Sequence, residues 1–134
     1  MNNNQKNTAP RAATPETESR ENSTTTSITE PSGKIKVVVQ NPGDFSRIVT
    51  VPNTIEALQE LIGGHIEVHH ISGSLLLVMD EEGRLKGLPE NVRCVQYGTI
   101  VGPVFITADK DEDFRSLTSE EIQTARAWLM KHSV

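Results

Sequence analysis

The chain has few aromatic residues and almost no cysteine. Its 134 residues include one Trp, one Tyr, three Phe and a single cysteine, Cys94. One cysteine excludes an internal disulfide and fits a reducing compartment such as the cytoplasm. The chain also lacks an apolar signal-peptide core and any apolar run long enough to cross a bilayer. We therefore expect a cytoplasmic protein that does not enter a membrane.

A strong charge of one sign is missing as well. The formal net charge is −5; residues 1–33 contribute three basic and four acidic residues, and the remainder contributes ten and fourteen. Both signs are interspersed along the sequence. Broad binding to a phosphate backbone draws its affinity from clustered Lys and Arg, so we expect no direct binding of nucleic acid.

The first quarter of the chain differs in composition from the rest. Residues 1–33 are rich in Asn, Thr, Ser, Glu and Pro and contain almost no apolar side chain larger than Ala. Such a segment buries too little surface to offset the entropy lost on ordering its backbone. The sequence predicts a disordered tail over residues 1–33 and a single domain over residues 34–134.

The pattern of apolar residues in that domain predicts strands and helices in a mixed order. β-Branched or alternating runs bounded by turn residues predict strands over 34–40, 45–51, 65–71, 74–80 and 97–107. We expect an α+β fold in which about five strands form a mainly antiparallel sheet and two helices pack against the same face. Because residues 75–79 are apolar at every position, that strand is expected to be covered on both sides.

Helix ends are marked by capping residues. Asn53, with Glu56 three residues later, predicts the start of the first helix, which Gly63 ends. Thr118 with Glu121 predicts the start of the second. In the last strand Pro103 has no N–H to donate, so Gly102 and Pro103 predict a bulge or an edge position.

The candidate metal ligands are His65, Glu67 and His69, which share one face of a predicted strand. Two imidazoles and a carboxylate are ligand types that suit zinc or iron. A flat strand, however, spaces alternate side chains roughly 6.6–6.8 Å apart, which is too far for tight coordination by these three alone. We favour the simpler interpretation, a polar face of a half-buried strand.

Two other possibilities are no stronger. Asp109, Asp111, Asp113 and Glu120 match the spacing of a calcium loop, but Phe114 stands where the turn needs Gly. Cys94 between apolar residues is typical of a packed side chain. We assign no catalytic residue and expect no cofactor or metal, although the sequence leaves enzyme activity open.

Several short motifs follow one another in a fixed order through the domain. They are residues 35–39, 54–59 with Gly63, Gly64 and 66–68, 80–83 with Leu85, Gly87 to Pro89 with Asn91, residues 100–102, and Phe114 with 116–118. In type and order, over about residues 34–130, they resemble the domain-of-unknown-function family 3846. That resemblance implies small accessory proteins of bacteriophages, plasmids and their bacterial hosts. It implies no catalytic residues and no substrate.

We expect a non-catalytic binding module that recognises an unidentified protein or small molecule through the turn around Gly83 and the loop that follows it. The candidate binding residues are Asp80, Glu82, Gly83, Leu88, Pro89 and Asn91. Two alternatives stay open: a metal-dependent enzyme acting on a nucleotide or nucleic acid, and an acidic decoy for a host DNA-binding protein. The oligomeric state is also open.

Overall fold

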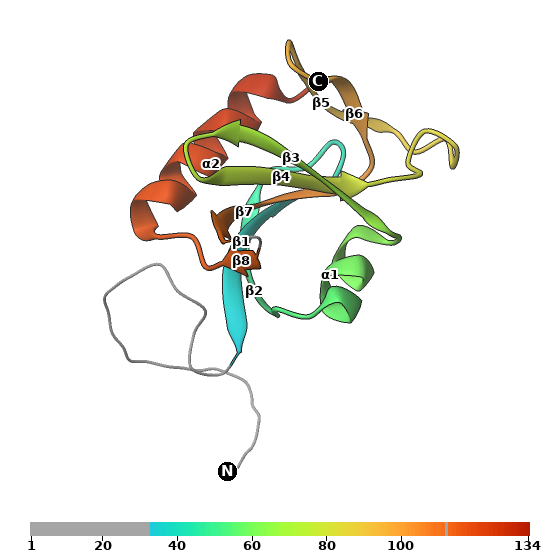
Figure 1. Ribbon diagram of the computed structural model, residues 1–134. Helices are drawn as coiled ribbons and strands as arrows, with labels where there is room; N and C mark the ends of the chain where they lie inside the picture. The colour runs from blue at the N-terminus through green and yellow to red at the C-terminus, as the bar shows by residue number, and fades with distance from the viewer. Residues whose placement is uncertain (1–32, 112) are drawn as a thin grey trace.

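The computed structural model describes residues 33–111 and 113–134, so the predicted disordered tail, apart from Gly33, lies outside the described residues. The elements are β1 (Lys34–Gln40), β2 (Arg47–Pro52), α1 (Ile55–Ile62), β3 (Ile66–Ser72), β4 (Leu75–Asp80), β5 (Glu90–Cys94), β6 (Gly98–Val101), β7 (Val104–Lys110), β8 (Asp113–Arg115) and α2 (Ser119–His132). Every strand pair is antiparallel. The predicted α+β fold is confirmed (Figure 1).

The main sheet has six strands and is built around β7. Its order is β2-β1-β7-β4-β3, and β8 pairs with the far end of β7, whereas β5 and β6 form a separate two-stranded sheet. The first residues of β7 pair with β1, and its last residues pair with β8. All residues of β4 are buried, as are residues 104–108 of β7. The prediction that residues 75–79 are covered on both sides is therefore confirmed.

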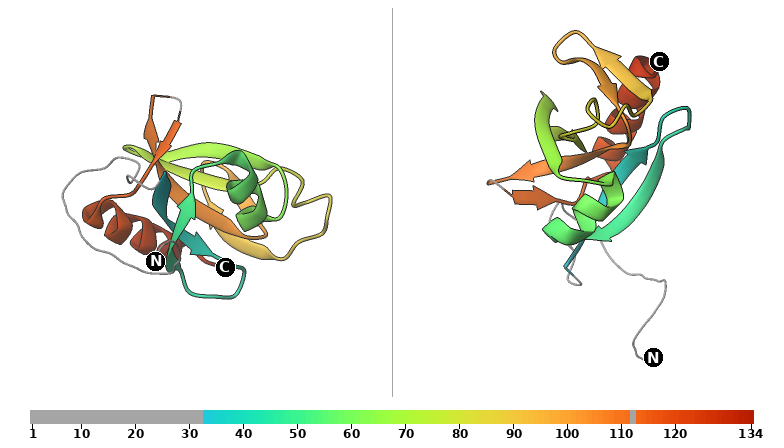
Figure 2. Two further views of the ribbon diagram at one scale, coloured as in Figure 1. Left: turned by 90° about the horizontal axis from the view of Figure 1, so that it is seen from below. Right: turned by 90° about the vertical axis from the view of Figure 1, so that its right-hand side faces the viewer.

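The two helices cover opposite faces of the main sheet. Successive side chains of a strand point to opposite faces, and along β1 Val37 packs with α1, whereas Val38 packs with α2. Figures 1 and 2 show the sheet between the two helices. The expectation that both helices share one face is wrong. Strands β1, β4 and β7 are apolar on both faces, and each face needs its own cover.

The first helix begins one residue later than predicted. Its N-cap is Thr54, whose side chain accepts a hydrogen bond from the backbone N–H of Ala57 at 3.2 Å. The amide of Asn53 instead donates to the carbonyl oxygen of Phe114 at 3.1 Å, between β8 and the start of α1. The prediction of Asn53 as the cap is wrong, because a distant carbonyl takes its side chain.

Other helix ends are as predicted. Gly63 ends α1 in the left-handed region, with φ of 92°. Thr118 and Glu121 form a reciprocal capping box at the start of α2: each side chain accepts a hydrogen bond from the other residue's backbone N–H. These features are local in sequence, and for that reason they could be recognised there.

The long strand predicted over residues 97–107 is two strands in two different sheets. The chain leaves β6 at Val101, turns at Gly102, where φ is 80°, and enters β7 at Val104. Pro103 lies between the strands, so its missing N–H costs no ladder bond. The predicted bulge or edge position is thus a crossing between sheets. The short strands β5 and β8 were not predicted.

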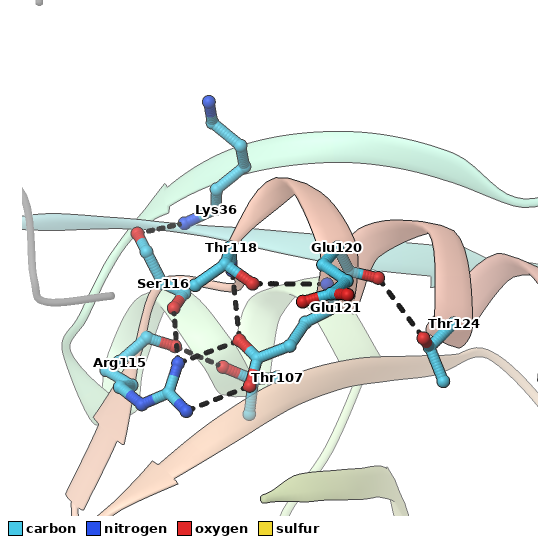
Figure 3. Close-up of polar contacts among 8 residues, drawn as sticks. All are labelled: Lys36, Thr107, Arg115, Ser116, Thr118, Glu120, Glu121 and Thr124. Atoms are coloured by element: carbon cyan, nitrogen blue, oxygen red, sulfur yellow. Dashed lines mark hydrogen bonds and ion pairs between the residues drawn. The ribbon is translucent and has the colours of Figure 1, made fainter. Parts of the chain in front are cut away.

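A compact polar network joins β8 to α2 (Figure 3). The guanidinium of Arg115 donates to both carboxylate oxygens of Glu121, at 2.8 and 2.9 Å. Next to it, the hydroxyl of Ser116 accepts a hydrogen bond from the backbone N–H of Lys36 at 2.8 Å. Hydrogen bonds from Arg115 lower the pKa of the Glu121 carboxyl below its ordinary value of 4.5, although burial opposes this.

We predict that Glu121→Gln lowers the stability of the protein at neutral pH. In acid, the variant and the parent should become nearly equal in stability. Because the pKa of Glu121 is lowered on folding, its ion pair stabilises the fold above about pH 4.5 and is lost as the pH falls below that value. At pH 7 the variant should be less stable by about 1–2 kcal/mol. That difference should shrink between pH 5 and pH 3.

Urea unfolding at several pH values, followed by tryptophan fluorescence, measures this difference. The exposed neighbour Glu120 supplies the matched control, Glu120→Gln. A difference between Glu121→Gln and the parent that stays constant from pH 7 to pH 3 would contradict the prediction.

Candidate functional site

The loop between β4 and β5 is anchored by a buried carboxylate at the end of β4. One oxygen of Asp80 accepts a hydrogen bond from the backbone N–H of Glu82 at 2.8 Å. The other accepts one from the Lys86 ammonium at 2.7 Å. The Asp80 side chain is 1% exposed and that of Lys86 is 36% exposed. The pair thus holds Lys86, in the second half of the loop, against the end of β4.

The same ion pair packs against the end of α1. The ammonium of Lys86 also donates to the carbonyl oxygen of Gly63 at 3.1 Å. A Cβ atom at Gly64 would lie 2.6 Å from that ammonium nitrogen and 3.1 Å from each carboxylate oxygen of Asp80. Burial alone raises the pKa of the Asp80 carboxyl, but hydrogen bonds from Lys86 and Glu82 outweigh it and lower the pKa.

Within the loop, backbone hydrogen bonds close successive turns. The N–H of Lys86 donates to the carbonyl of Glu82 at 3.0 Å, and the N–H of Leu88 donates to that of Gly83 at 3.1 Å. Gly83 is buried, and a Cβ atom there would lie 2.9 Å from the side chain of Val101. The loop is therefore held both internally and against β6.

The end of the loop packs against the crossing between the two sheets. A Cβ atom at Gly102 would lie 2.6 Å from Cδ1 of Leu88, and φ there is 80°, so any other residue would be strained and would displace the leucine. The N–H of Gly102 also donates to the carbonyl of Pro89 at 2.8 Å. Leu88 is half-buried and Pro89 is exposed.

Asn91 is a buried structural residue, 2% exposed. Its amide nitrogen donates to the carbonyl oxygens of Gln40 and Gly102, at 2.9 and 2.8 Å. Its amide oxygen accepts a hydrogen bond from the Gln40 side chain at 3.0 Å. The Gln40 side chain also donates to Ser133, just after α2. One side chain thus connects β1, β5 and the crossing before β7.

The six predicted binding residues lie in the β4–β5 loop or in the two strands beside it, and the structure gives them different environments. Asp80, Gly83 and Asn91 are buried. Leu88 is half-buried, and Glu82 and Pro89 are exposed. The residue that sequence reasoning missed is Leu85, at the tip, whose relative exposure is 87%. The sequence did indicate that Leu85 is exposed, because it lies between the charged residues Arg84 and Lys86 in a predicted turn.

The candidate metal ligands are only partly brought together. Glu67 and His69 share a face of β3 as predicted, and the His69 ring nitrogen lies 2.6 Å from a Glu67 carboxylate oxygen. The His69 ring stacks on Tyr97, with centroids 4.3 Å apart. His65 lies before β3 and is exposed. Among residues 33–111 and 113–134, no three His, Cys, Asp or Glu side chains are grouped as a metal site would require.

The other acidic candidates are distributed over three elements. Asp109 lies in β7, Asp113 in β8 and Glu120 in the first turn of α2. The residues with the spacing of a calcium loop therefore lie in a β-hairpin and at the start of a helix, not in one loop. Cys94 is buried in the core under α2, as its apolar neighbours indicated.

These observations define a small α+β domain with a tightly hydrogen-bonded surface loop. Its residues 35–130 match a family model described as Domain of unknown function (DUF3846). Because the match covers more than half of the 134 residues, the chain belongs to this family. No curated protein and no solved structure matches the chain. In the described part of the chain, neither helix combines the length and apolar character needed to cross a bilayer.

We predict that Asn91→Leu destabilises the fold. The leucine has a similar volume but removes three buried hydrogen bonds, those that Asn91 donates to the carbonyls of Gln40 and Gly102 and the one that it accepts from the Gln40 side chain. An unsatisfied buried polar group costs about 1–3 kcal/mol, so we expect a loss of about 2–5 kcal/mol in the free energy of unfolding. Urea unfolding measures it. Gln96→Leu at an exposed position is the control, and an Asn91→Leu variant as stable as that control would contradict the prediction.

Proposed function

We propose that this protein is a non-catalytic binding module that recognises a protein partner through the tip of the β4–β5 loop. The observation that carries the proposal is the exposed Leu85 side chain on a loop that is anchored by the ion pair between Lys86 and the buried carboxylate of Asp80. An isolated exposed leucine on a surface is common. A leucine on an anchored loop differs, because little conformational entropy is lost when it binds.

The residues around Leu85 fit a protein partner better than a small molecule. The exposed neighbours Glu81, Glu82 and Arg84 carry charges of both signs around one apolar side chain. An apolar centre with a polar rim is the usual composition of a protein interface. The guanidinium of Arg84 also donates to the carbonyl oxygen of Thr99 in β6, which holds this side of the tip in place.

The biological setting that we propose is that of an accessory protein of a mobile element or of its bacterial host. This part of the proposal follows from the family resemblance. The chemistry of the loop does not depend on it.

We predict that Leu85→Asp abolishes partner capture without unfolding the protein. Surface substitutions away from structural features usually change stability by less than about 0.5 kcal/mol. The full chain should be used as bait in an extract of its own cells, with captured proteins quantified by mass spectrometry. Partners of the parent should fall at least tenfold with Leu85→Asp.

Val95→Asp is the matched control, because Val95 is also fully exposed, at 103%, but lies in the β5–β6 turn. This variant should retain the partners of the parent. If Leu85→Asp retains all of them, or if the parent captures none, the proposal is wrong.

A further inference from the structure

A second surface, remote in sequence from the β4–β5 loop, lies along the outer edge of β2. In the described residues β2 pairs with β1 alone. The backbone N–H of Asn53 donates to the carbonyl of Gly33 at 3.0 Å, just beyond the β1–β2 ladder. Hydrogen-bonded and non-hydrogen-bonded pairs alternate along an antiparallel ladder. The pairs that include Ile48 and Thr50 are therefore of the non-hydrogen-bonded type.

The partners of β1 support this assignment. Lys36, which stands opposite Thr50, directs its N–H to the Ser116 hydroxyl and its carbonyl to the N–H of Leu117, away from β2. Ile48 and Thr50 accordingly direct their own N–H and C=O groups outward from the sheet. Pro52 follows and has no N–H, so the stretch able to accept another strand is short and well defined.

The side chains of Ile48 and Thr50 lie on the face of the sheet that α2 covers. Ile48 stands opposite Val38, which is buried in the core under α2, and residues directly opposite each other share a face. Ile48 is nevertheless 46% exposed. Next to the helix, the outermost strand thus retains an uncovered apolar side chain.

The turn between β1 and β2 lies beside α2, and two more exposed apolar residues are close to this contact in sequence. Arg126 of α2 donates to the Ser46 hydroxyl at 3.2 Å, which places the turn beside the second half of the helix. Phe45 precedes this contact, and Met130 follows Arg126 by one helical turn. Phe45 is 89% exposed and Met130 is 76% exposed.

The charges beside these apolar side chains are mainly positive. Lys34 and Lys36 share the face of Ile48 by strand alternation, and Arg126 reaches the turn from α2. The acidic residue nearest in sequence to Phe45 and Ile48 is Asp44, in the turn. The whole chain carries a formal charge of −5. The three cations beside this edge strand therefore give the surface a charge opposite to that of the protein as a whole.

We propose that the outer edge of β2 binds an extended acidic segment of a partner protein as an added strand. Main-chain hydrogen bonds to Ile48 and Thr50 would supply affinity, and alternate side chains would supply specificity. The segment that fits has an apolar residue opposite Ile48 and carboxylates two positions to either side, facing Arg126 and Lys36. This site is separate from Leu85, and neither proposal depends on the other.

The test uses the full ¹⁵N-labelled chain and an acetylated, amidated peptide, Thr-Glu-Thr-Ile-Thr-Glu-Thr. Its control has Lys in place of both Glu residues. In NMR titrations the amide signals of Ile48 and Thr50 should shift to saturation with the acidic peptide. The basic peptide should bind at least tenfold more weakly. Leu85→Asp should leave this titration unchanged.

Three variants distinguish main-chain pairing from charge attraction. Thr50→Pro removes an outward N–H and no ladder bond, and it should weaken binding at least tenfold, whereas Thr50→Val keeps that N–H and should bind within twofold of the parent. Arg126→Glu leaves the strand intact and should weaken binding at least fivefold. Shifts centred on other residues, or equal binding by both peptides, would overturn the proposal.

Hydrogen exchange in the peptide-free protein identifies other occupants of the edge. Rapid exchange of the Ile48 and Thr50 amides is expected of an open edge. Protection that persists on dilution would show that the chain covers this edge itself. Protection only at high concentration would show that a second copy does so. Either result would replace the proposed acidic partner.

Discussion

The arrangement of this domain depends on the hydrogen bonds of one buried amide. Asn91 holds the end of β1 through Gln40 and the crossing between the two sheets through Gly102. The carbonyl of Asn91 also accepts a hydrogen bond from the backbone N–H of Val134, after α2. The β5–β6 hairpin is therefore fixed to the main sheet by satisfied polar groups as well as by apolar contact. Buried polar groups that are fully paired favour one arrangement over its competitors.

Because the loop is fixed at both ends, its tip can carry an exposed side chain in a defined position. Asp80 fixes the start of the loop, and the contact of Leu88 with Gly102 fixes its end. Several of the motifs on which the family resemblance was based lie in this segment, and Asp80, Gly83 and Asn91 among them are buried. The surfaces that we propose for partners are the exposed surface around Leu85 and, separately, the edge of β2.

Much of the fold followed from local patterns, and the failures share one cause. The Thr118–Glu121 capping box and the stop at Gly63 involve neighbours in the chain, and both were predicted correctly. Asn53 was assigned wrongly because the carbonyl that takes its side chain belongs to Phe114, 61 residues away. The strand predicted through Pro103 was wrong because its two halves pair in different sheets. In the candidate site, the residue types indicated where the loop lies. Only the structure showed which of its residues are buried and hold the loop, and which are exposed and free to contact a partner.

The sequence by itself determined both helices and most of the strands, the helix stop and the α2 cap, because these depend on alternation, turn residues and contacts within a few positions. Only the tertiary structure decided which face each helix covers, which polar side chains are buried and which edge is open. Those properties depend on pairing between distant segments. Asn91 shows the difference, since its type suits a turn or a binding surface, and its role is set by carbonyl groups 11 and 51 residues away.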